Sequence, residues 1–156
     1  MTQESSAFRA GVGAIIVDPI GQVLAFQRAG RDGAWQLPQG GINPDEATVD
    51  SLWRELREET GLTPHDLQIV DEIPVWLGYE LPHDARSAKT GRGQTHRWFI
   101  LSPKRPDLAQ AIDFDATENE LIACEWMEWD TLVERAMAFR KPVYALLAKL
   151  LREHTM

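Results

Sequence analysis

Three glutamates within five residues, Glu55, Glu58 and Glu59, are the side chains of this sequence best suited to chemistry. If they lie on a helix, a rotation of about 100° per residue brings all three to one side. Carboxylates so close together repel one another, and the repulsion costs stability unless a cation lies between them. Such clusters suit Mg²⁺ or Mn²⁺, and a solvated acidic face is the alternative. Arg54 lies one turn before Glu58 and can orient it.

A helix with signals at both ends is predicted around these glutamates. Asn43 suits the N-cap, Pro44 the first helical position, and Glu46 the third, where it can complete a capping box and so have a structural role. Gly61 can end the helix in the left-handed conformation, and Pro64 prevents its resumption. The opposite side of the segment is apolar and is expected to form a buried stripe of Val49, Leu52, Trp53 and Leu56.

The segment from Gly40 to Leu62 resembles, without a gap, the motif of the Nudix hydrolase superfamily. In order, the motif is Gly, five residues, Glu, seven residues, Arg-Glu, an apolar residue, any residue, Glu-Glu, any residue, Gly and an apolar residue. Its fixed positions are filled here by Gly40, Glu46, Arg54, Glu55, Leu56, Glu58, Glu59, Gly61 and Leu62. A chance match over so many positions is rare, so the metal-binding interpretation is favoured over a solvated acidic face.

The resemblance implies an enzyme that cleaves a nucleoside diphosphate linked to another group, with two or more Mg²⁺ or Mn²⁺ ions. Such ions neutralise the phosphates, deprotonate a bound water and hold the leaving phosphate in line. It implies that Glu55 and Glu59 are metal ligands and that Glu58 is a further ligand or the general base. Gly40 would add its carbonyl oxygen, which a tight glycine turn leaves exposed. Arg54 is interpreted as the residue that orients the glutamates.

Further segments resemble one branch of the superfamily, the bacterial RNA pyrophosphohydrolases and the plant-type diadenosine tetraphosphate hydrolases. They are Phe-Arg-Ala-Gly-Val-Gly from Phe8, Trp-Gln-Leu-Pro-Gln-Gly-Gly-Ile from Trp35, Trp-Leu-Gly-Tyr-Glu-Leu-Pro from Trp76, Gly-Gln-Thr-His-Arg-Trp-Phe from Gly93 and Phe-Arg-Lys-Pro-Val-Tyr from Phe139. The chain departs from the branch where Phe8 replaces a tyrosine, Ala10 a proline, and Arg97 a lysine.

The same resemblance implies roles outside the predicted helix. A distal glutamate that completes the metal site or acts as base corresponds to Glu120, with Glu118 as the competitor. Arginines that approach the substrate phosphates correspond to Arg9 and Arg28, since guanidinium suits bidentate phosphate contact; exposed strand-end charges are the alternative. An aromatic residue that stacks on a base corresponds to Phe139, with a core anchor as the alternative.

Tyr79 is a further candidate for substrate binding, either by stacking on a base or, as the alternative, as an anchor of the core.

The order of the predicted elements favours an α+β fold, an α/β/α sandwich around a mixed β-sheet, which the resemblance also implies. Phe8 to Val17 and Gln22 to Arg28 are two strand candidates, expected to pair as a hairpin across the turn at Asp18 to Gly21. Further strands are expected at 67–77, as one or two strands broken near Pro74, at 95–101 and at 121–126. Helix is expected at 131–154, where Pro142 either splits it or starts a second helix after a turn at 139–141.

Composition is consistent with one domain over residues 1–156 whose first seven residues form a disordered tail. No apolar run approaches eighteen residues and no secretory signal is recognisable, so we expect a cytoplasmic protein without a membrane partner. The net charge of −8 argues against a protein that grips extended nucleic acid. A short phosphate chain, in a nucleotide polyphosphate or at the 5′ end of RNA, remains a suitable partner.

The first hypothesis is therefore a metal-dependent pyrophosphohydrolase that converts the 5′-triphosphate end of RNA to a monophosphate. The same chemistry on a dinucleoside polyphosphate, such as diadenosine tetraphosphate, is the second. A catalytically inactive Nudix module that only senses nucleotides is the third. The glutamates argue against the third hypothesis, because a sensor needs no metal cage.

Overall fold

The structure, a computed structural model, describes residues 7–30, 33–88, 90–116 and 121–154. Its strands are β1 (Phe8–Ile16), β2 (Val23–Arg28), β3 (Trp35–Gln36), β4 (Gln39–Gly41), β5 (Leu67–Glu80), β6 (Gly93–Pro103) and β7 (Leu121–Met127). Its helices are α1 (Thr48–Thr60), α2 (Trp129–Arg135) and α3 (Lys141–His154), with short 3₁₀ turns η1 (His83–Ala85), η2 (Ala109–Ala111), η3 (Phe114–Ala116) and η4 (Ala138–Arg140).

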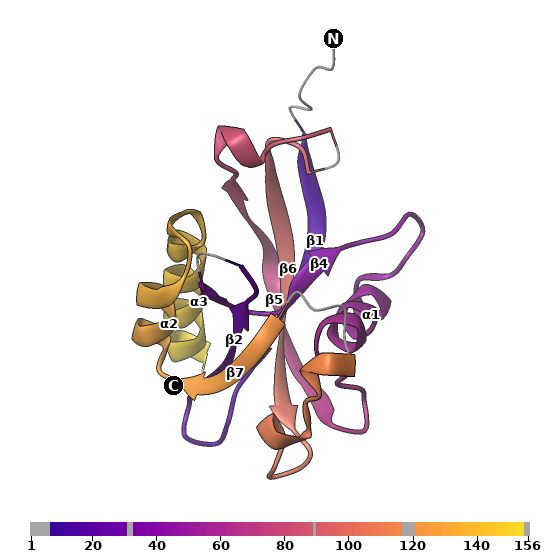
Figure 1. The fold of residues 1–156 in the computed structure, drawn as a ribbon, viewed down its shortest axis with the longest axis vertical. Helices are drawn as coiled ribbons and strands as arrows, with labels where there is room; N and C mark the ends of the chain where they lie inside the picture. The colour runs from indigo at the N-terminus through magenta and orange to yellow at the C-terminus, as the bar shows by residue number, and fades with distance from the viewer. Residues whose placement is uncertain (1–6, 31–32, 89, 117–120, 155–156) are drawn as a thin grey trace.

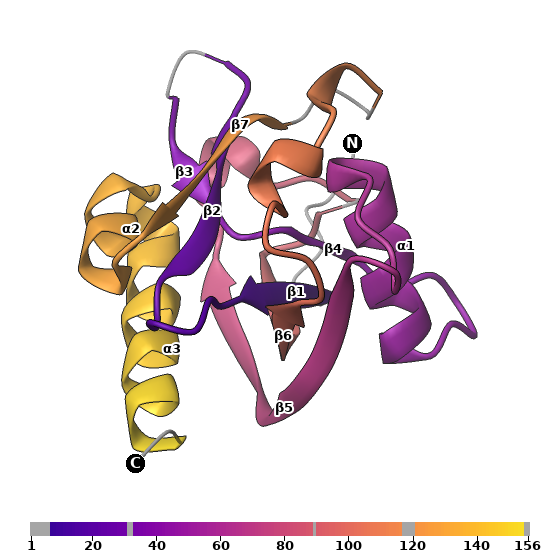
Figure 2. The same cartoon turned by 90° about the horizontal axis from the view of Figure 1, so that it is seen from below.

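Two sheets lie between α1 on one side and α2 with α3 on the other (Figures 1 and 2). The first is mixed, in the order β4-β1-β6-β5, with β1 and β6 parallel and the other neighbours antiparallel. The second is antiparallel, in the order β3-β2-β7. The predicted sandwich with a mixed sheet is confirmed, and the strands divide between two sheets.

Strands β1 and β2 carry apolar side chains on both faces because both of their faces are covered. In β1, Ile15 packs into the core against α2 and α3, whereas Val12 and Ile16 pack into the core against α1. In β2, Val23 and Leu24 divide between the two cores in the same way. Burial on both faces explains why these segments read as continuous apolar runs instead of alternating with polar residues.

The prediction that the first two strands pair as a hairpin is wrong. The turn between them forms as expected, since the Gly21 N–H donates to the Asp18 carbonyl oxygen. However, β1 pairs along its whole length with β6, and β2 pairs with β3 and β7. Between the described residues of the two segments, the isolated bridge of Val17 with Val23 is the one pairing. The turn therefore passes the chain from one sheet to the other.

The predicted start of the glutamate-bearing helix is also wrong, since Ala47 is the N-cap of α1 and not Asn43. The Glu46 carboxylate does accept a hydrogen bond from the Asn43 N–H, at 3.0 Å, as half of a capping box would. That pair closes a separate turn before the helix, in which Asp45 has a left-handed φ of 64°. Helical backbone cannot run from Asn43 through this turn, so α1 begins only at Thr48, while the Glu46 carboxylate also binds Arg54.

The end of α1 and most of its buried stripe agree with the prediction. Gly61 ends the helix with φ of 78°. Leu52 and Leu56 are fully buried, and Trp53 packs at the edge of the same core. Val49 departs from the predicted stripe, because it lies in the first turn and is 41% exposed.

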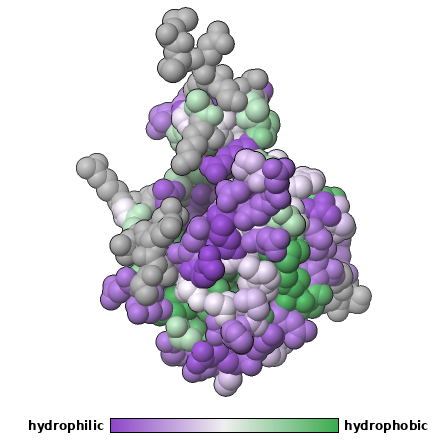
Figure 3. All heavy atoms as spheres, turned by 90° about the vertical axis from the view of Figure 1, so that its right-hand side faces the viewer, coloured by the Kyte–Doolittle hydropathy of each residue, from purple (hydrophilic) through white to green (hydrophobic). Residues whose placement is uncertain are grey.

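Strands β5, β6 and β7 are longer than predicted, and the elements follow the expected order. β5 continues through Pro74, where its pairing with β6 is irregular between Glu72 and Trp76. The helical pattern near the C-terminus divides into α2 and α3, and Pro142 lies in the first turn of α3. The face on the α1 side is largely hydrophilic (Figure 3). Among the described residues, no helix is long and apolar enough to span a membrane.

Candidate active site

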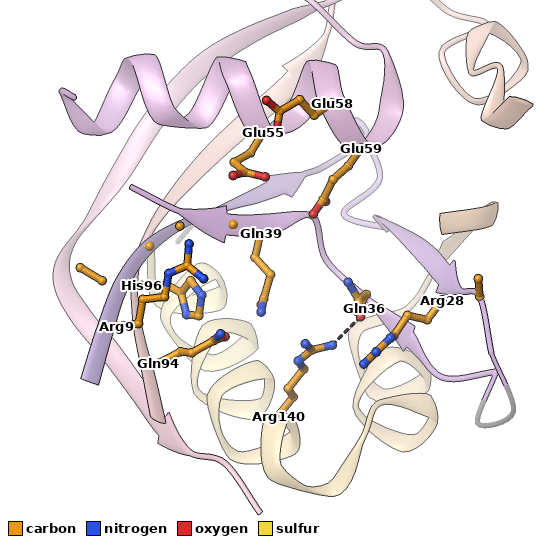
Figure 4. A pocket seen from close by; sticks show the side chains of 15 residues that line it. Arg9, Arg28, Gln36, Gln39, Glu55, Glu58, Glu59, Gln94, His96 and Arg140 are labelled. Carbon is orange, nitrogen blue, oxygen red and sulfur yellow. Dashed lines mark hydrogen bonds between the residues drawn. The ribbon is translucent and has the colours of Figure 1, made fainter. Parts of the chain in front are cut away.

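A pocket of about 600 Å³ lies where α1, η4 and the strands of both sheets meet. Its polar lining consists of Arg9, Arg28, Gln36, Gln39, Gly40, Gly41, Glu55, Glu58, Glu59, Gln94, His96 and Arg140. The glutamates of α1 form one wall, and the arginines project from other elements on the opposite side (Figure 4). The pocket is therefore divided into an acidic wall and a basic wall.

The acidic wall depends on the close approach of β4 to α1. Gly40 pairs with Val12 of β1 and faces the helix, and a Cβ built on it would overlap the Glu55 carboxyl group. Glycine is therefore required there if Glu55 is to keep its position. Of the three carboxylates, Glu59 is the most buried, at 6% exposed, and Glu58 is the most accessible.

Arg54 links the acidic wall to the loop before the helix, as its predicted orienting role requires. Its Nε and Nη2 donate to the two oxygens of Glu46, each at 2.9 Å. Its Nη1 donates to Glu55 at 2.8 Å and to Glu58 at 3.3 Å, and Nη2 reaches the Gly41 carbonyl at 2.7 Å. One guanidinium thus fixes two of the three carboxylates of the wall.

The basic wall contains both arginines predicted to approach phosphates. Arg9 of β1 lies against Gly41, since a Cβ there would overlap the Arg9 guanidinium. Arg28 of β2 donates from Nη1 to the Met137 sulfur at 3.5 Å. Neither arginine forms an ion pair with a described residue, so both keep their charge available to an anion in the pocket.

Tyr79 and Phe139, the predicted aromatic contacts, lie outside the lining of this pocket. The Tyr79 ring packs between His96 and Phe139, with centroids 5.8 and 5.2 Å away. Its hydroxyl donates to Gln94 Oε1 at 2.7 Å and accepts from Gln39 Nε2 at 2.9 Å. Tyr79 therefore holds two amides that do line the pocket, and direct contact of either ring with substrate stays a prediction.

Sequence reasoning missed several lining residues, above all His96 and Arg140. His96 is 2% exposed, and burial, with the nearby charges of Arg140 and Arg9, lowers its pKa to about 3, so the ring is neutral at pH 7. The two-residue alternation of Gln94, His96 and Trp98 along β6 could have placed the first two on one face. Nothing local to Arg140 indicated that it faces the pocket.

A comparison with family models decides the relationship: the NUDIX domain model matches residues 7–147. The chain belongs to the NUDIX family. An RNA pyrophosphohydrolase from Marinomonas sp. (strain MWYL1) is 36% identical over 146 residues, which cover 90% of this NUDIX chain and 88% of the relative. Another from Psychrobacter sp. (strain PRwf-1) is 36% identical over 156 residues, covering 96% and 88%. The predicted family resemblance is confirmed.

Solved structures agree on the NUDIX fold. The crystal structure of a C. elegans Ap4A hydrolase binary complex has a TM-score of 0.67 at 17% identity, covering 93% of this chain and 98% of that one. At this identity the comparison bears on the fold alone.

Divalent metal is the cofactor that NUDIX hydrolases generally use, and the acidic wall suits it in kind, since carboxylate and carbonyl oxygens are the ligands that Mg²⁺ and Mn²⁺ prefer. Within the described ranges, no group of three or more His, Cys, Asp or Glu side chains is already arranged to hold an ion. Glu55 and Glu58 are directed to Arg54 instead. Glu120 and its competitor Glu118 lie outside the described residues.

Proposed function

We propose that this NUDIX chain is a metal-dependent pyrophosphohydrolase that converts the 5′-triphosphate end of RNA to a monophosphate and releases pyrophosphate. The observation that carries the proposal is the pocket with an acidic wall on α1 and arginines opposite. A phosphate chain bound between the walls would meet metal-binding oxygens on one side and guanidinium groups on the other. Relatives called RNA pyrophosphohydrolases, 36% identical over most of the chain, support the choice of substrate.

The acidic wall would hold the cation, which we expect to be Mg²⁺ or Mn²⁺, with two or more ions. Glu55, Glu59 and the Gly40 carbonyl are the proposed ligands, with Glu58 and Glu120 as further ligands or the base. A bound divalent cation lowers the pKa of its water and neutralises phosphate charge. Glu58 suits a base that accepts a proton, because it is the most accessible of the three and its contact with Arg54 is the longest.

The basic wall would bind and orient the phosphates. Arg9 and Arg28 reach the pocket from two different strands, so together they can hold a phosphate chain in one direction. The net charge of −8 opposes contact with a long stretch of RNA, so only the end of the chain would enter the pocket. A cytoplasmic location, where transcripts are met, belongs to the same proposal.

The test is a comparison of kcat/KM, in Mg²⁺, for triphosphorylated RNA, diadenosine tetraphosphate and a nucleoside diphosphate sugar. We expect the RNA end to be the best substrate and pyrophosphate to be released. A higher kcat/KM on diadenosine tetraphosphate would transfer the proposal to dinucleoside polyphosphates. Nucleotide binding without turnover of any of the three would indicate a sensing module.

A variant pair tests the acidic wall under the same conditions. Glu59→Gln removes a proposed metal ligand and should lower kcat by about 100-fold or more while the protein stays folded. Glu125→Gln removes an exposed carboxylate that pairs with Arg135 away from the pocket, and it should retain wild-type kcat. Near-normal kcat for Glu59→Gln would make its assignment as a ligand wrong.

A further inference from the structure

Arg140 is a buried cation with no acidic partner among the residues that the structure describes. Its exposed fraction is 8%, and it forms no ion pair there. Its Nη1 donates to Gln36 Oε1, its guanidinium carbon lies 5.2 Å from the centre of the Phe139 ring, and its Nε has no hydrogen-bond partner. Burying an uncompensated charge is costly, so such an arrangement persists where an anion is bound in function.

The guanidinium of Arg140 enters the pocket from η4, on the side opposite the glutamates (Figure 4). Gln36 holds it there from β3, and its own side chain is only 6% exposed. Gln36 of β3 pairs with Phe26 of the buried strand β2, so the backbone that carries the Gln36 amide is held in place. Gln36 therefore fixes Nη1 of the planar Arg140 guanidinium, and the remaining N–H groups of that guanidinium keep a defined orientation.

Two further groups lie in the same part of the pocket as Arg140, one neutral and one charged. His96 is buried, and its Nδ1 has no hydrogen-bond partner among the described residues. Arg9 lines the same pocket without an ion pair in those ranges. The charges of Arg140 and Arg9 both lower the pKa of His96, after the larger effect of burial. Arg9 of β1, His96 of β6 and Arg140 of η4 therefore lie near one another in one part of the basic wall.

We propose that Arg140, positioned by Gln36, binds a phosphate group of the substrate that does not lie at the acidic wall, with Arg9 and His96 beside it. A guanidinium offers donors alone, and a phosphate offers acceptors alone together with the missing negative charge. A nucleobase would leave that charge unpaired. The inference deepens the proposed function, on which it rests for the identity of the ligand as a phosphate chain.

The test measures binding, so that it does not depend on turnover. Affinities for AMP and for the methylene-bridged analogues of ADP and ATP are determined by calorimetry in Mg²⁺. For the wild type, affinity should rise with each phosphate. In Arg140→Gln the affinity for the ATP analogue should fall by about 10- to 100-fold, and that for AMP by less than about threefold. Arg140→Lys, which keeps the charge without the fork, should recover part of the loss.

Arg135→Gln is the matched control, since it removes an exposed arginine on α2 and should leave all three affinities unchanged. An equal loss for Arg140→Gln on every ligand, or no loss, would overturn the inference, as would a wild type that binds none of them. Arg140→Lys answers the same question if Arg140→Gln does not fold. A protein that binds the analogues as described but hydrolyses no triphosphorylated RNA would refute the proposed function alone.

Discussion

Two adjacent glycines separate the walls of the pocket, and each makes room for a different side chain. A methyl group on Gly40 would push against the Glu55 carboxyl group, which is the movable end of its side chain. Gly40→Ala should therefore leave the melting temperature within a few degrees of wild type but lower kcat by at least about tenfold, because Glu55 is displaced. Steady-state kinetics and thermal unfolding of the same preparation check this expectation.

The neighbouring substitution is its matched control. A methyl group on Gly41 would displace the Arg9 guanidinium instead, so Gly41→Ala should raise KM more than it lowers kcat. If the two variants have the same kinetic defect, the division into an acidic and a basic wall does not correspond to different steps.

The Tyr79 hydroxyl can be tested without removing its ring. Because it donates to Gln94 and accepts from Gln39, Tyr79→Phe releases both amides but keeps the packing on His96 and Phe139. We expect KM to rise about two- to tenfold with kcat nearly unchanged.

Tyr144→Phe is the control for that variant. It also removes a buried hydroxyl, one that accepts from the Leu37 N–H, and it should lower stability by about 1–3 kcal/mol at unchanged KM. An unchanged KM for Tyr79→Phe would mean that the amides keep their places without the hydroxyl.

At the scale of elements, the loop before α1 is tied to the helix by one carboxylate. Hydrogen bonds from Arg54, then from Ser51 and the Asn43 N–H, lower the pKa of Glu46 from 4.5 to about 2. The folded protein therefore holds the ionised form, and this stabilisation is present above pH 4.5 and is lost as pH falls toward 2. Glu46→Gln should be less stable than wild type at pH 7, and the difference should shrink between pH 4.5 and 2.

Urea unfolding at several pH values measures that difference. Glu125→Gln, at an exposed ion pair, should show at most a small difference at pH 7. If the difference in unfolding free energy between wild type and Glu46→Gln does not change with pH, the hydrogen bonds to Glu46 do not stabilise the ionised carboxylate.

The elements that could be predicted are those whose signals are local. Gly61 ended α1 as expected because a left-handed C-terminal residue depends on its own backbone. The N-terminus of α1 could not be predicted from Asn43, since the predicted contact of Glu46 with the Asn43 N–H forms but closes a separate turn, in which Asp45 is left-handed. The pairing of β1 with β6 joins residues more than eighty positions apart, and an apolar run carries no information on its partner.

For the whole molecule, the contrast between local and long-range signals also explains why one wall of the site could be predicted and the other could not. The acidic wall lies on one helix, so the spacing of its glutamates was sufficient to predict it. The basic wall is assembled from β1, β2 and η4, and only the resemblance indicated Arg9 and Arg28. Arg140 reaches the pocket from the opposite helical layer, because η4 turns the chain between α2 and α3. The sandwich thus brings a cation from one outer layer to face carboxylates from the other.

If the acidic wall holds the proposed Mg²⁺ or Mn²⁺, the stability of the whole molecule should depend on that metal. Glu55, Glu58 and Glu59 share one wall, and an ion bound to them favours the folded state by mass action. At a Mg²⁺ concentration about 100 times its Kd the gain would be about 2.7 kcal/mol, which for a chain of this length raises Tm by several degrees relative to EDTA. Glu55→Gln and Glu59→Gln should each lose most of that rise. Glu72→Gln, at an ion pair with Arg97 on the sheet, should keep it. Calorimetric scans of the four proteins with Mg²⁺ and with EDTA measure the rise, and an equal rise in all four would locate the stabilising ion outside the acidic wall.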